Sequence, residues 1–375
     1  MRRIDRYWKR CAAGMMAALM LMTAGEGGFT SFAAQSLNSP SKIVISNTQT
    51  QEGNASALQS APVTTAAFGT VNTPVTDASS YFGAGRMTML ANHDTRAQQL
   101  AVIIENGAGG LIVVDGGWQE NSAYVLEQIK QRGGHVAAWL LTHPDSDHVG
   151  ALADILYNHS SEITIDGIYY SFLEDSWYAE KEPAVAAMVS HLKGAFQKVD
   201  PSVLHGNIVA GQVIEAGPAK IQVLNQAYAA NNDFVNNSSV AYLVSLNGTN
   251  VVFLGDMARS GGENLMANVD LGALNCTMVQ MAHHGQNGVD YEVYKALRPS
   301  VCLWPTPQWL WDNDNGGGTG TGPWKTQETR NWMVRLGVKT YFCTKDGDQV
   351  IEEAPVQQPQ VEEKEESKQP EIKAE

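Results

Sequence analysis

The chain has 375 residues, of which 43% are hydrophobic and 17% charged, enough to bury one large core or two ordinary ones. Its formal net charge is −14 and it has no long basic run, which speaks against a dedicated nucleic-acid-binding protein. Of the four cysteines, three lie beyond the first 34 residues, and this odd number argues against a disulfide framework.

The first 34 residues have the layout of a secretory signal peptide. Arg2–Arg10 is basic, Cys11–Met22 is apolar, and small residues up to Ala34 offer a cleavage site. The apolar stretch is short for a membrane span, and an uncleaved anchor is the alternative. We therefore expect residues 1–34 to be removed and the mature chain, without a membrane span, to be secreted or associated with the cell envelope.

Two further segments are expected to lie outside the folded domain. Residues 35–79 are rich in Ser, Thr, Asn and Gln and have little hydrophobic periodicity, which predicts a disordered spacer. From Glu352 to Glu375 the chain has eight Glu and three Lys, a net charge of −5, so we expect residues 353–375 to form a disordered acidic tail. One domain, residues 80–352, remains.

The first half of this domain alternates short apolar runs with one amphipathic stretch. Strands are expected at residues 87–90, 100–104, 111–114 and 137–141, and a helix at 121–132. The turn Gly107–Gly110 predicts a hairpin between the second and third of these strands. Gly133 and Gly134 are expected to end the helix.

The middle, residues 162–235, is expected to mix strands with a helix, and the second half to return to strands. Strands are predicted at residues 163–170 and 221–224, with a helix at 184–196 between them. Val240–Leu246 and Val251–Leu254 flank Asn247-Gly248, a dipeptide typical of tight hairpins. The mixture of strands and helices predicts an α/β protein.

The most informative motif directly follows the apolar strand at 137–141. His143, Asp145, Asp147 and His148 place four potential metal ligands within six residues. The ligands would lie on a loop at the carboxyl end of a buried strand, a common position for active sites in α/β proteins. Two imidazoles and two carboxylates that converge would be costly to bury without a cation, so a divalent metal is expected.

Other predicted strands also end in acidic or imidazole side chains. Asp115 follows the strand at 111–114, and Asp256 follows Phe253-Leu254-Gly255. His283 and His284 follow the apolar run at 278–282. Four separate strands thus deliver potential ligands at their carboxyl ends.

Together these motifs resemble the metallo-β-lactamase fold superfamily. By motif the chain is most similar to the metal-dependent domains of ComEC-type competence proteins and to the phosphorylcholine esterases of choline-binding surface proteins. The shared motifs are H-x-D-x-D-H, a Ser-bearing strand before F-L-x-G-D, and H-H-G. The resemblance covers about residues 82–352, and it implies a four-layer αββα sandwich.

The resemblance also implies a centre with two divalent metal ions. By position, His143 and Asp145 would hold one ion, Asp147, His148 and His283 would hold the other, and Asp256 would bridge both. We favour His283 over His284 as the ligand, and His284 would then contact a ligand or the substrate. Asp115 would orient the ligand loop, as carboxylates behind metal ligands do.

The sequence departs from the superfamily pattern in two ways. Asp145 stands where the superfamily usually has a second His, and this carboxylate makes Mn²⁺ an alternative to the expected Zn²⁺. The superfamily also often supplies a His between the ligand loop and the G-D strand. His159, His191 and His205 lie there, and His205 is the best candidate to complete the first site.

These expectations lead to a specific function. We expect an exported hydrolase that cleaves a phosphodiester or phosphoester through a hydroxide bridging two metal ions. Asp147 would orient the nucleophile or accept its proton, and His284 is the second candidate catalytic residue. The substrate would be a small molecule or a cell-envelope phosphoester, with nucleic acid not favoured. The alternatives are hydrolysis of a β-lactam or another ester or amide, and a non-catalytic module that binds the cell envelope.

Two further features leave alternatives open. The aromatic segment Trp304–Trp324 predicts a hydrophobic cap over the sheet, and the alternative is a substrate wall that binds a quaternary ammonium group. Cys276, Cys302 and Cys343 lie in or beside apolar runs and are expected to be buried thiols. A disulfide between Cys302 and Cys343 is the alternative.

Overall fold

A computed structural model describes residues 85–352. The predicted signal peptide, spacer and acidic tail lie outside the described residues. Within them, the strands form two sheets with the orders β15-β1-β2-β3-β4-β6-β7, where β5 pairs with β4, and β14-β13-β12-β11-β10-β9-β8. Both sheets combine antiparallel and parallel pairs, as the predicted α/β class requires.

The strands are short, and those predicted from the sequence lie close to their predicted positions, whereas β7, β8, β13, β14 and β15 have no counterpart among the predictions. Those of the first sheet are β1 (Arg86–Met89), β2 (Ala101–Glu105), β3 (Leu111–Asp115), β4 (His135–Leu140), β5 (Thr164–Ile165), β6 (Ile168–Tyr170), β7 (Leu204–Gly206) and β15 (Gln349–Glu352). Those of the second are β8 (Val213–Ala216), β9 (Ala219–Val223), β10 (Tyr242–Leu246), β11 (Thr249–Phe253), β12 (Met278–Gln280), β13 (Val301–Trp304) and β14 (Thr340–Cys343).

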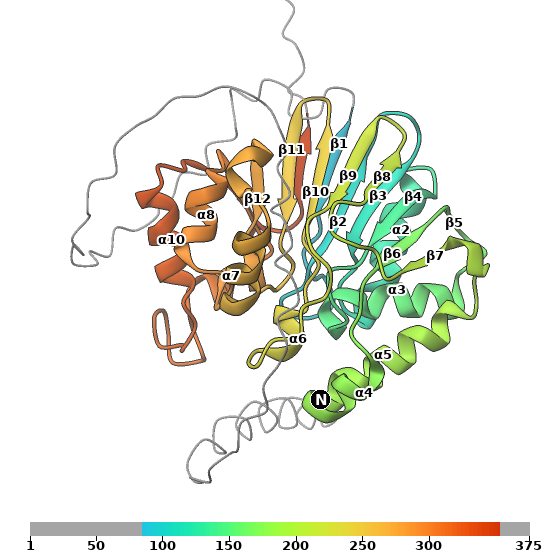
Figure 1. Ribbon diagram of the computed structural model, residues 1–375, viewed down its shortest axis with the longest axis horizontal. Coiled ribbons are helices and arrows are strands. Elements are labelled where there is room, and N and C mark those ends of the chain that lie inside the picture. Colours follow the sequence, from blue (N-terminus) through green and yellow to red (C-terminus); the bar gives the residue numbers. More distant parts are fainter. Residues whose placement is uncertain (1–84, 353–375) are drawn as a thin grey trace, which may run out of the picture. The chain divides into compact units, whose positions relative to one another are not determined.

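Helices cover the outer face of each sheet (Figure 1). The first sheet carries α2 (Ser122–Gln131), α3 (Ser146–Asn158) and α5 (Pro183–Phe196), and the second carries α7 (Arg259–Asn268), α8 (Tyr291–Leu297) and α10 (Thr326–Arg335). Shorter helices are α4 (Asp175–Lys181), α6 (Phe234–Asn237) and α9 (Gln308–Trp311). This order of layers, helix, sheet, sheet and helix, confirms the predicted αββα sandwich. No helix within residues 85–352 is both long and apolar enough to cross a bilayer.

Strand β3 shows how its sequence produces two cores. Ile112 and Val114 face the apolar layer between the sheets, whereas Leu111 and Val113 face the helices on the outside. Successive side chains of a strand point to opposite faces, so a strand covered on both sides must be apolar throughout. Burial of each such side chain contributes about 1.5–3 kcal/mol.

Both predicted hairpins are present. β2 and β3 pair antiparallel across the turn after Glu105, and β10 and β11 pair antiparallel across Asn247-Gly248. Asn247 and Gly248 have φ angles of 50° and 85°, the left-handed values that a two-residue hairpin turn requires.

The structure differs from the prediction in two regions. The second half, expected to contain mainly strands, also contains the helices α7, α8 and α10. The other region lies between α3 and β8. The strand expected at residues 163–170 is divided into β5 and β6 by Asp166 and Gly167. The helix expected at 184–196 is present as α5, but α4 precedes it and was not predicted. The sequence of α4 begins with Asp175-Ser-Trp and has no apolar periodicity long enough to indicate a helix.

The three cysteines within residues 85–352 are free thiols. Cys276, Cys302 and Cys343 are all buried, which confirms the expectation and excludes the alternative disulfide in this structure. Burial raises the pKa of Cys276 and of Cys343 to about 12. These thiols are therefore protonated and unreactive at neutral pH.

Candidate metal centre

Four strands bring their carboxyl ends to one place between the sheets. β3 and β4 pair in parallel in the first sheet, and β11 and β12 pair in parallel in the second. In each sheet this parallel pair lies next to antiparallel strands, so the direction of neighbouring strands changes at this point of the sheet. Side chains that follow β3 and β4 therefore face those that follow β11 and β12, as is usual for sites at the carboxyl ends of strands.

The ligand loop lies between the end of β4 and the start of α3. The carbonyl oxygen of Asp145 accepts hydrogen bonds from the backbone N–H groups of His148 and Val149, each at 3.0 Å. α3 begins at Ser146, so Asp147 and His148 occupy its first turn. A carboxylate in the first turn is favoured by the helix dipole, which helps to keep Asp147 ionised.

Gly150 allows this first turn to approach the chain that follows β3. A Cβ atom at Gly150 would lie 2.6 Å from the backbone nitrogen of Gln119 and 3.3 Å from the carbonyl oxygen of Gly117. Gly117 in turn donates its N–H to the carbonyl oxygen of His148 at 3.2 Å. The close contact fixes the position of the helix start, and with it the position of His148.

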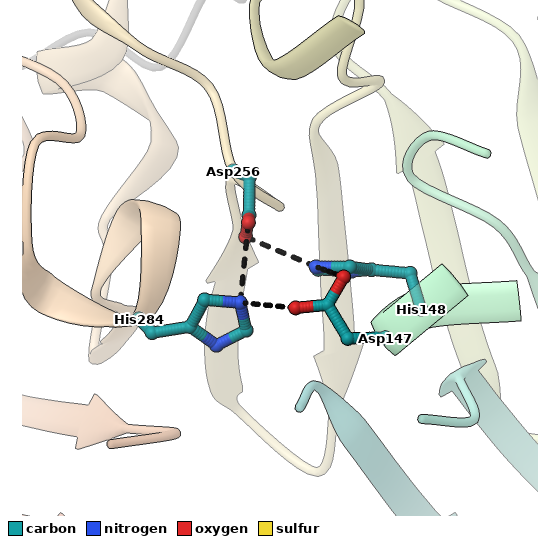
Figure 2. Close-up of side chains that lie close together, drawn as sticks. All are labelled: Asp147, His148, Asp256 and His284. Carbon is teal, nitrogen blue, oxygen red and sulfur yellow. Dashed lines mark ion pairs between the residues drawn. The ribbon is translucent and has the colours of Figure 1, made fainter. Parts of the chain in front are cut away.

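Four buried side chains converge on one small space (Figure 2). Asp147, His148, Asp256 and His284 each offer one potential ligand atom, and these atoms all lie within 4.8 Å of one another. His148 Nε2 is 3.2 Å from Asp256 Oδ1. His284 Nε2 is 3.1 Å from Asp256 Oδ2 and 3.3 Å from Asp147 Oδ2. Two imidazoles and two carboxylates at such distances form a donor set suited to a divalent metal.

Unsatisfied polar atoms support the same conclusion. Within residues 85–352, five buried atoms at this place have no hydrogen-bond partner, namely Nε2 of His143, His148 and His284, Nδ1 of His283 and Oδ1 of Asp256. A buried polar atom without a partner costs about 1–3 kcal/mol, and such atoms are rare in folded proteins. Bound metal would satisfy several of them at once, so the residues present fit a divalent ion.

The other two residues of the ligand loop lie beside this cluster. His143 Nε2 is 3.5 Å from Asp145 Oδ2, and the His143 ring centroid is 4.1 Å from that of His148. His143 is completely buried, whereas the Asp145 side chain is 27% exposed. The pair offers one nitrogen and one carboxylate for a second ion.

The structure places the two adjacent histidines differently. The sequence favoured His283 as the ligand, but His284 is the residue that joins the cluster. His283 Nε2 lies 3.9 Å from Asp256 Oδ2 and its side chain is 19% exposed. Both residues have left-handed φ angles, 53° and 52°, so their side chains do not follow the regular alternation of a strand. Such angles cost about 1–3 kcal/mol at residues other than Gly and are typical of functional sites.

The surroundings of His284 hold it in this unusual conformation. Its carbonyl oxygen accepts a hydrogen bond from Thr306 Oγ1 at 2.7 Å, and its Nδ1 lies 3.1 Å from the carbonyl oxygen of Pro305. The second contact requires a proton on Nδ1, which leaves Nε2 of the neutral ring free to bind a metal.

Asp115 supports the ligand loop from behind. Its Oδ2 accepts from Thr142 Oγ1 and faces His148 Nδ1, both at 2.7 Å, and its Oδ1 accepts from the N–H of Thr142 at 2.8 Å. These contacts agree with the orienting role predicted for Asp115. They fix the ring of His148 so that Nε2 points into the cluster.

Asp256 is held by the tight turn after β11. Its N–H donates to Ser239 Oγ at 3.2 Å. Gly255 before it has a φ of 57°, and a Cβ there would lie 2.7 Å from Cβ of Thr142. Gln280 Nε2 donates to the carbonyl oxygen of Gly255 at 3.0 Å. Only glycine allows this close approach between the turn and the ligand loop.

The charged groups of the cluster shift one another's pKa. Burial would lower the pKa of His148 and His284, but Asp256 and Asp147 reverse the effect, and the pKa of His284 is raised to about 9. Burial would likewise raise the pKa of Asp147 and Asp256, but the histidines lower both. Burial lowers the pKa of His283. Without a metal, the protons of His148 and His284 supply the positive charge that the carboxylates require.

The remaining histidines between the ligand loop and Asp256 do not join the cluster. His205 stacks on Tyr169 with ring centroids 4.5 Å apart, and it is not among the converging ligands of the described chain. His159 Nδ1 pairs with Glu162 at 2.6 Å, and His191 is exposed on α5. Sequence reasoning also missed Gln98, which contacts Asp147 from a loop without a recognisable motif.

The aromatic segment is mainly a cap over the second sheet. Trp304 is completely buried, and the guanidinium of Arg330 lies 4.5 Å from the ring centroid of Trp311. The cap prediction is therefore confirmed for these two tryptophans. Trp309 and Trp324 are half-buried and meet edge to face with centroids 4.8 Å apart, so only this pair still suits the alternative of a substrate wall.

Comparison with known proteins supports the resemblance to the metallo-beta-lactamase superfamily. Residues 94–215 match the family model of the metallo-beta-lactamase superfamily. The match includes the ligand loop and ends before Asp256 and His284. It does not separate the ComEC-type domains from the phosphorylcholine esterases. No curated protein matches the sequence.

Several solved structures show a weak similarity to this chain. The metallo-beta-lactamase fold protein YhfI from Bacillus subtilis is 12% identical with a TM-score of 0.43, over 71% of this chain and 99% of its own. Zn²⁺-bound PqqB from Methylobacterium extorquens is 13% identical with a TM-score of 0.35, over 52% of this chain and 71% of its own. CmlA, a diiron beta-hydroxylase from Streptomyces venezuelae, is 11% identical with a TM-score of 0.42, over 72% of this chain and 54% of its own.

Proposed function

We propose that this protein is a metal-dependent hydrolase that cleaves a phosphodiester or phosphoester outside the cell. The observation that carries the proposal is the oxygen-rich donor set, in which Asp145 lies 3.5 Å from His143 beside a cluster that already contains Asp147 and Asp256. Carboxylates favour hard divalent ions, which in turn bind phosphate oxygens well.

The residues divide between two ion positions. Asp147, His148, Asp256 and His284 would hold one ion, and His143 and Asp145 would contribute to the other. Zn²⁺ is the expected metal and Mn²⁺ the alternative. When bound, such ions activate a water molecule and stabilise negative charge on the phosphoryl oxygens.

Asp147 and His283 contribute chemistry of their own. Asp147 stays ionised because its histidine neighbours lower its pKa against the effect of burial, so it can orient a water molecule or accept a proton. His283 is neutral at neutral pH because burial lowers its pKa, and its Nδ1 has no hydrogen-bond partner among residues 85–352. A neutral imidazole at the partly exposed edge of the cluster can contact an oxygen of the substrate.

The site of action and the substrate class complete the proposal. The pattern of residues 1–34 supports export, so the substrate would be a small molecule or a component of the cell envelope that carries a phosphoester. Fractionation of the native host with an antibody against the protein tests this location. Recovery in the cytoplasmic fraction alone would contradict export.

Activity assays on the purified protein test the reaction itself. We expect hydrolysis of bis(p-nitrophenyl) phosphate with added Zn²⁺ or Mn²⁺, and loss of activity by roughly 10²–10⁴-fold in Asp147→Asn. Asp175→Asn is the matched control, because Asp175 lies on the exposed surface of α4 and pairs with Lys193. Hydrolysis of nitrocefin but of no phosphoester would contradict the proposal and favour the β-lactam alternative.

A further inference from the structure

Gln98 connects a loop of the first sheet to the metal centre. It lies in the segment of residues 90–100 that joins β1 to β2, and its Nε2 donates a hydrogen bond to Asp147 Oδ2 at 3.1 Å. The same carboxylate oxygen lies 3.3 Å from His284 Nε2. A side chain from outside every recognised motif therefore contacts a candidate ligand directly.

Two tryptophans hold the backbone of this segment. The indole N–H of Trp118 donates to the carbonyl oxygen of Gln98, and that of Trp309 donates to the carbonyl oxygen of Arg96, both at 2.6 Å. The N–H of Leu100 also donates to the carbonyl oxygen of Asp147 at 3.2 Å. These bonds come from separate parts of the chain and restrict the segment on both sides of the Gln98 side chain.

We propose that Gln98 is a positioning residue for Asp147, and that Trp118 and Trp309 keep it in place. A carboxylate ligand can rotate about its side-chain bonds, and a fixed donor on one oxygen selects one orientation. Such partners of metal ligands typically change metal affinity by roughly 10–100-fold when they are removed. The inference rests on the metal centre of the proposed function. It also gives the half-buried Trp309 a role outside the hydrophobic cap.

Binding of Co²⁺ to the full chain tests this inference without any substrate. Gln98→Met keeps the length of the side chain but removes the amide donor, and Gln131→Met is its control, because Gln131 is exposed on α2. Trp309→Phe keeps a ring but removes the N–H, and Trp332→Phe is its control, because Trp332 packs on Tyr291. The measurements are the Co²⁺ dissociation constant, the visible spectrum of bound Co²⁺ and the melting temperature of the metal-free protein.

We expect Gln98→Met to weaken Co²⁺ binding by at least about 10-fold and to change the Co²⁺ spectrum, with an unchanged melting temperature. We expect Trp309→Phe to weaken binding by about fivefold, as for one lost hydrogen bond, and both controls to bind as the wild type does. Wild-type Co²⁺ affinity and a wild-type Co²⁺ spectrum in Gln98→Met would overturn the proposal. A loss of Co²⁺ affinity accompanied by an equivalent fall in the melting temperature of the metal-free protein would also overturn it, because the loss would then reflect general destabilisation. Wild-type affinity in Trp309→Phe would overturn the role of the tryptophan.

The outcome is separable from that of the activity assays. If the wild type binds Co²⁺ but cleaves no phosphoester, the proposed function fails while the role of Gln98 is still decided by binding. If the wild type binds no Co²⁺, the metal centre itself is overturned, and the role of Gln98 with it.

Discussion

Asp115 Oδ2 lies 2.7 Å from His148 Nδ1, and both side chains are completely buried. The contact fixes which nitrogen of His148 carries a proton and directs Nε2 toward Asp147 and Asp256. A carboxylate–histidine pair of this kind makes the imidazole a better metal ligand. The strand end of β3 therefore supports the candidate metal centre from outside the group of converging side chains.

Removal of the Asp115 charge is expected to weaken metal binding. Asp115→Asn keeps the shape of the side chain but loses the strong acceptor for His148, so we expect a loss of metal affinity of roughly 10–100-fold. Competition with a chromogenic chelator measures the change. Asp175→Asn on the exposed surface of α4 should bind as the wild type does. Equal affinities in the two variants would contradict the orienting role.

Metal binding is expected to depend on pH through His284. Its pKa is raised from 6.5 to about 9, so the protonated ring stabilises the metal-free fold below pH 6.5, and this contribution is lost as the pH rises through about 9. A metal binds the neutral ring, so affinity for Co²⁺ should increase over the same interval, with release of protons. Calorimetry in two buffers of different ionisation enthalpy measures the released protons. A pH-independent affinity over this range would contradict the assignment.

The two adjacent histidines should respond differently to substitution. His284→Ala removes a nitrogen from the convergent cluster, so we expect a large loss of metal affinity. His283→Ala removes a group at the edge, so we expect metal bound in the convergent cluster to be retained, with reduced activity on phosphoesters. Elemental analysis of the purified variants measures the metal, with His191→Ala on the exposed face of α5 as control. If His283→Ala lost the metal and His284→Ala retained it, His283 would be the ligand, as the sequence predicts.

The close approach at Gly150 is expected to be essential for stability. A Cβ there would lie 2.6 Å from the backbone nitrogen of Gln119, so Gly150→Ala should displace α3 and destabilise the fold by about 1–3 kcal/mol. Gly272→Ala is the control, because the nearest atom to its Cβ would be Asp270 Oδ1 at 3.4 Å. Denaturant unfolding measures both variants. A larger loss in the control would show that contact at the helix start is not the cause.

Much of this protein is determined by its sequence locally. The apolar strands, the hairpin at Asn247-Gly248 and the ligand loop before α3 follow from side-chain periodicity and turn chemistry, which act between neighbouring residues. The strand-end positions of Asp115, Asp256 and the two histidines follow in the same way. A family resemblance carried by those motifs was sufficient to predict the αββα sandwich.

Only the tertiary structure decided the details of the metal centre. The position of His284 among the converging side chains, with His283 at their edge, depends on two consecutive left-handed residues and on the contacts of His284 with Thr306 and Pro305, which follow β13. Gln98 reaches Asp147 across 49 positions of sequence, and no local pattern encodes such a contact. Local interactions fix where a ligand lies along a strand or loop, whereas its orientation depends on the packing of distant segments around it.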